Sequence, residues 1–125
     1  MTGIVFDAGA LIAFERNDRR VVLLAKRLLA LRGKVVVPAG VVGQVWRDGS
    51  RQVRLSRLLG SPLVAVDPLD DRRARAAGQI CGVSGTRDVI DAAVVLAARE
   101  HGLPVATSDP ADLQRLDATV RLVVV

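Results

Sequence analysis

Aspartates stand in this sequence where apolar segments begin or end, and they are the residues most able to do chemistry. Asp88 and Asp91 head the segment RDVIDAAVVLAA (residues 87–98), which is apolar from Ala92 onward, while Asp7 and Asp109 follow the short runs IVF and VATS. Carboxylates crowded at a partly buried edge would repel one another and lose hydration, which raises their pKa values. A bound divalent cation would relieve both costs.

The cation that suits these residues is Mg²⁺ or Mn²⁺. Cys81 and His101 are the only cysteine and histidine, so the available ligands are oxygens, which favour these two ions over zinc. Asp91 shares its predicted helical face with Val94 and Val95, so its side chain points where apolar residues go. We therefore expect an all-oxygen site for Mg²⁺ or Mn²⁺.

Each aspartate also has a purely structural interpretation. Asp88 and Asp91 could form a capping pair at the start of their helix, a contribution of about 1 kcal/mol. Asp109 precedes Pro110, an ordinary signal for a helix start, and Asp7 could simply turn the chain. The residue types alone do not distinguish a metal site from these structural roles. The positions of the four carboxylates in the fold distinguish them.

Apolar periodicity and turn residues predict alternating strands and helices. The predicted strands are Val-rich and lie at residues 4–7, 34–38, 62–67, 104–108 and 120–125. The predicted helices span residues 9–17, 18–31, 38–46, 50–59, 69–81, 88–100 and 110–116. This alternation predicts a mostly parallel central sheet covered on both faces. The expected fold is one α/β domain over residues 1–125, a three-layer α/β/α sandwich.

Such a sheet would bring the acids together. The carboxyl ends of its strands and the amino ends of the following helices lie along one edge, where ligands usually bind. Asp7 and Asp109 end predicted strands, whereas Asp88 and Asp91 begin a predicted helix. We expect these residues, far apart in the sequence, to meet at that edge.

Other sites that handle phosphate fit the sequence less well. A phosphoacceptor receiver domain could use Asp67 after the third predicted strand, but it also needs a late lysine, and no lysine follows Lys34. A haloacid-dehalogenase-type phosphatase needs the same lysine and a second Asp two residues after Asp7, where Gly9 stands. The segments VVGQVW and GVSGT are too poor in glycine for a phosphate-binding loop.

Composition indicates a globular protein with a basic surface. Hydrophobic residues make up 50% of the 125 residues and charged residues 25%, and no apolar run approaches the ~20 residues that cross a bilayer. The N-terminal segment lacks the charged region of a signal peptide, and a lone cysteine suits a reducing compartment. We therefore expect a cytoplasmic location without membrane contact. The net charge of +5 favours nucleic acid, although a solvated basic surface would carry the same charge.

Two blocks of the sequence, IVFDAGALIAF (residues 4–14) and DVIDAAVVLAAREHGLPVATSDPADLQRL (residues 88–116), resemble a PIN domain. The similarity is greatest to the VapC-type toxin ribonucleases of bacterial type II toxin–antitoxin systems, and it covers nearly the whole chain. It implies hydrolysis of RNA phosphodiester bonds that depends on Mg²⁺ or Mn²⁺. Matched residue by residue, Asp7, Asp91 and Asp109 are the expected catalytic, metal-binding acids. Asp88 is a further expected metal ligand.

The resemblance also implies supporting residues and contains one departure. Asp112 could assist the metal ligands, and the hydroxyl of Thr107 or Ser108 could hold a carboxylate or a water. The family usually has a glutamate where this chain has Gln44, and an amide adds no charge and cannot act as a base. Glu15 is a possible substitute, although eight helical residues place it roughly 12 Å from Asp7.

This departure leaves two functions open. The first is a metal-dependent endoribonuclease toxin that a cognate antitoxin neutralises. The second is a catalytically weakened PIN-like domain that binds RNA or an antitoxin without efficient cleavage.

The resemblance further implies a structured RNA substrate such as tRNA or rRNA, a cognate antitoxin and a homodimer. Arg47, Arg51 and Arg54 recur near helical spacing and could bind RNA phosphates, although each could equally lie on a solvated helix face. The apolar run VVLLAKRLLAL (residues 21–31) could line an antitoxin groove or a dimer face, or belong to the core.

Overall fold

Strands and helices alternate along the chain in the computed structural model, which describes residues 2–125. The strands are β1 (Gly3–Phe6), β2 (Lys34–Pro38), β3 (Val64–Asp67), β4 (Val105–Thr107) and β5 (Leu122–Val124). The helices are α1 (Ala8–Glu15), α2 (Arg19–Ala30), α3 (Ala39–Val45), α4 (Val53–Leu59), α5 (Asp71–Ser84), α6 (Val89–His101) and α7 (Pro110–Leu116).

All strands pair in parallel in one sheet of order β3-β2-β1-β4-β5. β1 is central, with Val5 beside Val36 of β2 on one side and beside Val105 of β4 on the other. These valines are fully buried because helices cover both faces of the sheet,. The predicted α/β fold with a mostly parallel sheet is confirmed.

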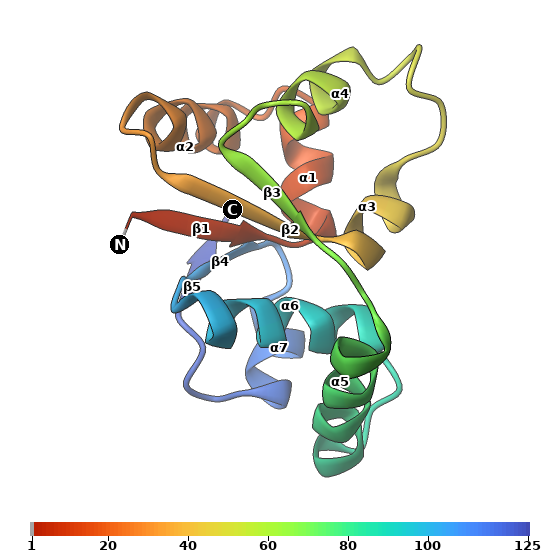
Figure 1. Ribbon diagram of the computed structural model, residues 1–125. Coiled ribbons are helices and arrows are strands. Elements are labelled where there is room, and N and C mark those ends of the chain that lie inside the picture. Colours follow the sequence, from red (N-terminus) through yellow and green to blue (C-terminus); the bar gives the residue numbers. More distant parts are fainter. Residues whose placement is uncertain (1) are drawn as a thin grey trace.

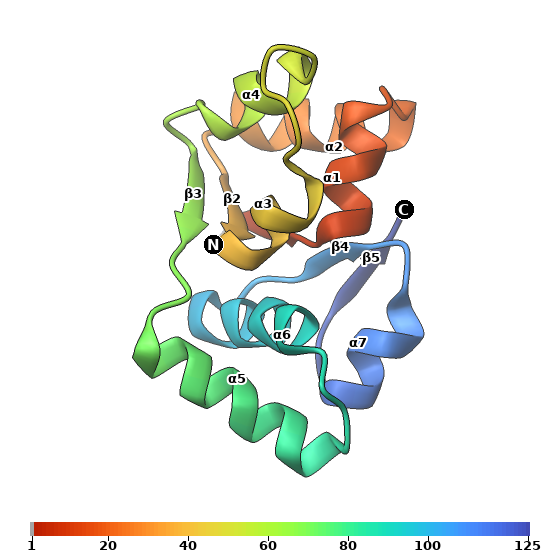
Figure 2. The same ribbon diagram turned by 90° about the vertical axis from the view of Figure 1, so that its right-hand side faces the viewer.

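The helices form one layer on each face of the sheet. In Figures 1 and 2, α1, α2, α3 and α4 lie on one face, and α5, α6 and α7 lie on the other. α6 contacts β1 and β2 on one side and α5 and α7 on the other. It is therefore apolar around nearly its whole circumference, and Ala92, Val94 and Val95 are fully buried,.

Two predicted helix limits were wrong. The fourth helix was expected from residue 50 but begins at Val53, because residues 46–52 form a hydrogen-bonded turn in which the Arg51 N–H donates to the Asp48 carbonyl over 3.0 Å. The fifth helix was expected to end at Cys81 but continues to Ser84. It ends there because Gly85 adopts a left-handed conformation with φ of 71°,.

None of the helices between residues 2 and 125 is both long and apolar enough to span a membrane.

Candidate active site

Two of the acids lie where the strand order of the sheet reverses. From β1 the chain continues to β2 and β3 on one side, whereas β4 and β5 lie on the other side. Asp7 directly follows β1 and Asp109 lies two residues after β4. The carboxyl ends of adjacent strands at such a reversal flank a crevice, the usual ligand site of an open α/β sheet.

Asp7 is a nearly buried carboxylate, with 7% of its surface exposed. Its Oδ1 accepts a hydrogen bond from the Ala10 N–H over 2.9 Å, and the nearby Thr107 hydroxyl also favours its charged form and lowers its pKa. Burial nevertheless raises the pKa of Asp7 above its ordinary value, and the nearby charge of Asp109 adds to the increase,. The donors hold the side chain in place without compensating fully for its lost hydration.

The turn after β4 connects Asp7 to Asp109. Fully buried Thr107 accepts a hydrogen bond from the Asp109 N–H at its Oγ1 over 2.9 Å, so one hydroxyl contacts both acids. Asp109 stands at the N-cap of α7, but its side chain makes no capping hydrogen bond. Its exposed carboxylate therefore remains available to a ligand.

Ser108 packs closely on the first turn of α1. A Cβ atom added to Gly9 would lie 2.1 Å from the Ser108 Oγ and 3.4 Å from Oδ1 of Asp7. Glycine at this position thus allows the β4–α7 turn to approach the end of β1.

Three more acids line a pocket beside this pair. Asp88, Asp91 and Asp112 surround a cavity of about 180 Å³ together with Arg115. Asp88 is the N-cap of α6 and accepts the Asp91 N–H over 2.9 Å, so the capping interpretation is correct for Asp88. Capping does not explain the side chain of Asp91, because only the backbone N–H of Asp91 takes part in it.

Asp91 is the most perturbed acid of the cluster. Burial raises its pKa to about 7, and the charges of Asp88, Asp112 and Asp7 contribute,. Because Asp91 interacts electrostatically with both Asp112 and Asp7, it links the pocket to the pair at the strand reversal. We name Asp7, Asp88, Asp91, Asp109 and Asp112 the acidic edge.

The acidic edge is not neutralised by ion pairs, although Arg115 lines the same pocket. Within residues 2–125, none of its carboxylates forms an ion pair with a lysine, arginine or histidine. Its donors are all carboxylate or hydroxyl oxygens, a set that fits Mg²⁺ or Mn²⁺. No three acidic, histidine or cysteine side chains in this part of the chain lie close enough to hold an ion together as they stand. The side chains would have to turn toward one another to share one.

Gln44 and Glu15 lie in different surroundings. Gln44 is exposed in the last turn of α3, one turn after Gly40 on the same helical face,. A Cβ at Gly40 would lie 2.4 Å from Cδ1 of Ile90, so this face of α3 approaches the start of α6 next to Asp91. Glu15 instead ends α1 and accepts a hydrogen bond from Gln52 Nε2 over 2.7 Å. The structure does not bring Glu15 to the acidic edge.

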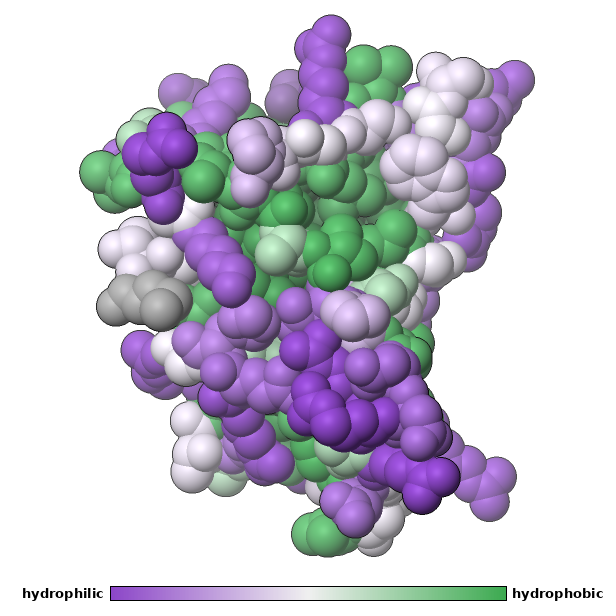
Figure 3. All heavy atoms as spheres, in the orientation of Figure 1, coloured by the Kyte–Doolittle hydropathy of each residue, from purple (hydrophilic) through white to green (hydrophobic). Residues whose placement is uncertain are grey.

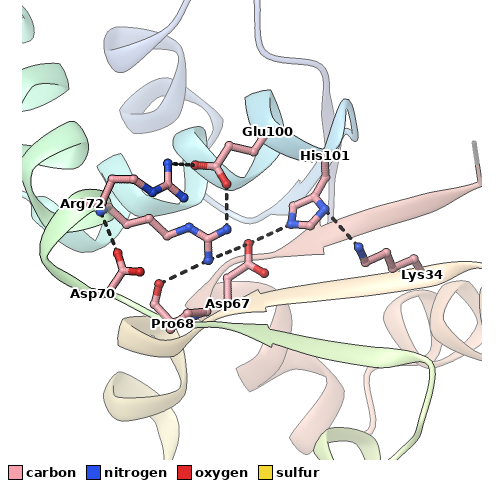
Figure 4. Close-up of polar contacts among 8 residues, drawn as sticks. Lys34, Asp67, Pro68, Asp70, Arg72, Glu100 and His101 are labelled. Carbon is pink, nitrogen blue, oxygen red and sulfur yellow. Dashed lines mark hydrogen bonds and ion pairs between the residues drawn. The ribbon is translucent and has the colours of Figure 1, made fainter.

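Asp67 ends β3 at the same edge of the sheet but belongs to a separate polar network. β2 lies between β3 and β1, so about 10 Å separates the ends of these two strands. Figure 4 shows Asp67 beside the His101 ring, whose Nε2 lies 2.9 Å from Oδ2 of Asp67 and whose Nδ1 lies 3.1 Å from Lys34 Nζ. Arg73 extends the network by donating to Glu100 over 2.7 Å. These contacts tie α5 and α6 to the sheet.

The three arginines predicted to bind RNA lie in two different surroundings. The Arg47 guanidinium donates to the carbonyls of Gly43 and Trp46 over 3.1 and 2.7 Å. Arg51 and Arg54 line a hollow of about 320 Å³ whose other lining residues are Arg57, Glu15, Gln52 and Val53. We name this hollow the basic pocket.

Gln52 organises the wall of the basic pocket and was not identified from the sequence. Its Oε1 accepts the N–H groups of Arg47 and Asp48 over 2.8 and 3.0 Å, and its Nε2 donates to Glu15 and to the Val45 carbonyl. Nothing in the local sequence distinguishes such a glutamine from a solvated one, because its partners come from three segments.

Comparison with protein families matches residues 4–118 to the family described as PIN domain. Comparison with curated proteins finds no match.

Several solved structures share the fold. FitAcB from Neisseria gonorrhoeae is 23% identical, with a TM-score of 0.64 and 95% of each chain covered. The sarcin–ricin loop cleaving toxin VapC20 from Mycobacterium tuberculosis is 20% identical, with a TM-score of 0.61, over 84% of this chain and 87% of its own. Rickettsia felis VapBC2, bound to a promoter DNA fragment, is 12% identical, with a TM-score of 0.70 and 99% of each chain covered.

Proposed function

The chain belongs to the PIN domain family, and from this premise we propose that it is a VapC-type toxin, a metal-dependent endoribonuclease that a cognate antitoxin neutralises. The observation that carries the proposal is the acidic edge, whose carboxylates crowd together and, within residues 2–125, form no ion pair with a cationic side chain. A fold needs no such arrangement for stability, because the crowding raises the free energy of the charged acids.

Asp7, Asp91 and Asp109 are the proposed ligands of a Mg²⁺ or Mn²⁺ ion, with Asp88 and Asp112 in support. When bound, such an ion stabilises charge on phosphate oxygens and lowers the pKa of a bound water. The Thr107 hydroxyl fixes Asp7 and the turn that carries Asp109. Asp109, whose carboxylate caps no helix, is exposed and therefore accessible to an RNA phosphate.

Gln44 supports the second candidate function, a PIN domain that binds RNA or an antitoxin but cleaves inefficiently. Its amide oxygen can coordinate a cation, but it adds no charge to the site. The acidic edge still holds five carboxylates, so we favour the active nuclease.

The proposed partners are a structured RNA such as tRNA or rRNA, a cognate antitoxin, and a second copy of the chain in a homodimer, all in the cytoplasm. VapC20, which shares the fold, is described as a sarcin–ricin loop cleaving toxin, and VapBC2, which also shares it, as bound to a DNA fragment from its promoter. The surface supports protein partners as well, because the view in Figure 3 contains a hydrophobic area over β3 and the adjoining helices. Val53, Val66 and Trp46 are among the large hydrophobic residues left exposed.

RNA cleavage by purified protein tests the proposal. A pool of structured RNAs would be incubated with and without Mn²⁺ or Mg²⁺, using the wild type, Asp91→Asn and Gln44→Glu. We expect metal-dependent cleavage by the wild type that Asp91→Asn abolishes. Cleavage by Gln44→Glu alone would support the weakened domain instead, and no cleavage by either protein would overturn the nuclease.

A further inference from the structure

The basic pocket carries positive charge that the protein does not neutralise. Within residues 2–125, Arg54 and Arg57 have no ion-pair partner, and Arg51 has only a distant one, Asp48, at 3.7 Å. Glu15 supplies the one carboxylate of the pocket lining, and its Oε2 is engaged by Gln52 rather than by an arginine. Three guanidinium groups against one carboxylate leave the pocket with a net positive charge.

The pocket has a defined wall rather than three independent side chains. Arg54 and Arg57 lie three residues apart on α4 and therefore on one helical face,. Arg51 precedes them in the turn that Gln52 holds through hydrogen bonds to Arg47 and Asp48. The guanidinium groups consequently extend from an ordered backbone around one hollow.

The basic pocket and the acidic edge lie at opposite ends of α1. α1 begins directly after Asp7 and ends at Glu15 in the pocket wall, so one helix of roughly 12 Å connects the two sites. Figure 1 shows α1 rising from the edge of the sheet to α4. A polyanion that is bound at the acidic edge and follows α1 would reach the basic pocket.

We propose that the basic pocket is a second RNA-binding site, which holds backbone phosphates of the strand whose scissile phosphate lies at the acidic edge. This inference rests on the proposed nuclease function and names Arg51, Arg54 and Arg57 as the phosphate ligands. Arg47 is not among them, because its guanidinium is occupied by backbone carbonyls.

The contacts of this site are to phosphate and not to bases. The single tryptophan near the pocket, Trp46, covers Gly49, where a Cβ would lie 2.6 Å from its Cζ2 atom. The pocket lining contains no aromatic residue on which a base could stack,. The site therefore binds RNA of any sequence, and its binding weakens with salt.

Fluorescence anisotropy of a labelled single-stranded RNA in EDTA tests the inference, because cleavage without metal is excluded. Arg54→Gln/Arg57→Gln would be compared with Arg72→Gln/Arg75→Gln, which removes the same charge from α5. Arg72 and Arg75 are exposed and pair with Glu100 and Asp71 at 4.0 and 3.0 Å. Arg54→Lys/Arg57→Lys keeps the charge and controls for folding.

We expect the pocket variant to bind about 25-fold more weakly at ~0.1 M salt, or roughly fivefold for each arginine, and to lower the slope of log K against log salt by about 1.4. The α5 variant should lose much less. Equal losses in the two variants, or none in the pocket variant, would overturn the inference. The binding assay does not involve cleavage. If the wild type fails to cleave RNA but the pocket variant still binds RNA more weakly, only the nuclease function is rejected.

Discussion

At the scale of single residues, Asp91 connects the structure to a measurable pH dependence. Its pKa is about 7 in the folded protein, against an ordinary value of 3.8. The folded state therefore binds the proton more tightly than the unfolded state, so the free energy of unfolding falls as pH rises from about 4 through 7. Above pH 7 the full cost of the charged carboxylate is present.

Asp91→Asn should therefore stabilise the metal-free protein at pH 8. We expect a gain of about 1–2 kcal/mol, after allowance for solvent screening at a partly exposed group. Urea unfolding at pH 8 and pH 4 measures it, and the gain should disappear at pH 4, where wild-type Asp91 is protonated. A variant less stable than the wild type at pH 8 would show that the carboxylate is not crowded.

Gly9 gives a second prediction at this scale. Alanine would favour the helix by up to about 1 kcal/mol, but its Cβ would meet Ser108 Oγ at 2.1 Å. Rotation of the Ser108 hydroxyl would relieve this contact, but Ser108 Cβ would lie 3.2 Å away, so the β4–α7 turn that carries Asp109 would have to shift slightly. We expect Gly9→Ala to reduce RNA cleavage at least tenfold with little change in urea unfolding. Unchanged cleavage would show that the position of this turn is not critical.

At the scale of elements, the turn between α3 and α4 depends on one side chain. Gln52→Leu would leave the Glu15 carboxylate, the Val45 carbonyl and two N–H groups without their partner. We expect a loss of about 1–3 kcal/mol of unfolding free energy. Exposed Gln79 on α5 provides the matched control, Gln79→Leu, which should change stability little. Equal effects in both variants would contradict a special role for Gln52.

The elements themselves could be predicted where a pattern is local. The Val-rich runs and the 3.6-residue stripes identify the strands and helices, and the order of strands and helices implies the parallel sheet. The start of α4 could not be predicted, because residues 46–52 obtain their hydrogen bonds from one another, two of them through the side chain of Gln52. The end of α5 could not be predicted either. Gly85, rather than the earlier Gly82, ends α5 because only Gly85 adopts a positive φ.

At the scale of the whole molecule, α1 separates two charged sites, with the acidic edge at its N-terminal end and the basic pocket at its C-terminal end. The sequence allowed the prediction that Asp7, Asp88, Asp91 and Asp109 share an edge, since parallel topology fixes that relation. It could not show that Glu15 belongs with arginines, because this depends on how α1 packs against α4. The chain thus places an acidic edge and a basic pocket where one polyanion could reach both.

Titration of the metal-free protein with Mn²⁺ at pH 7, followed by calorimetry, tests most directly whether the acidic edge is a cation site. We expect the wild type to bind Mn²⁺ and to release protons, since Asp91 is about half protonated at this pH and must ionise to act as a ligand,. Asp91→Asn should lose the proton release and most of the affinity. Failure of the wild type to bind Mn²⁺, or equal binding and proton release by Asp91→Asn, would contradict the account.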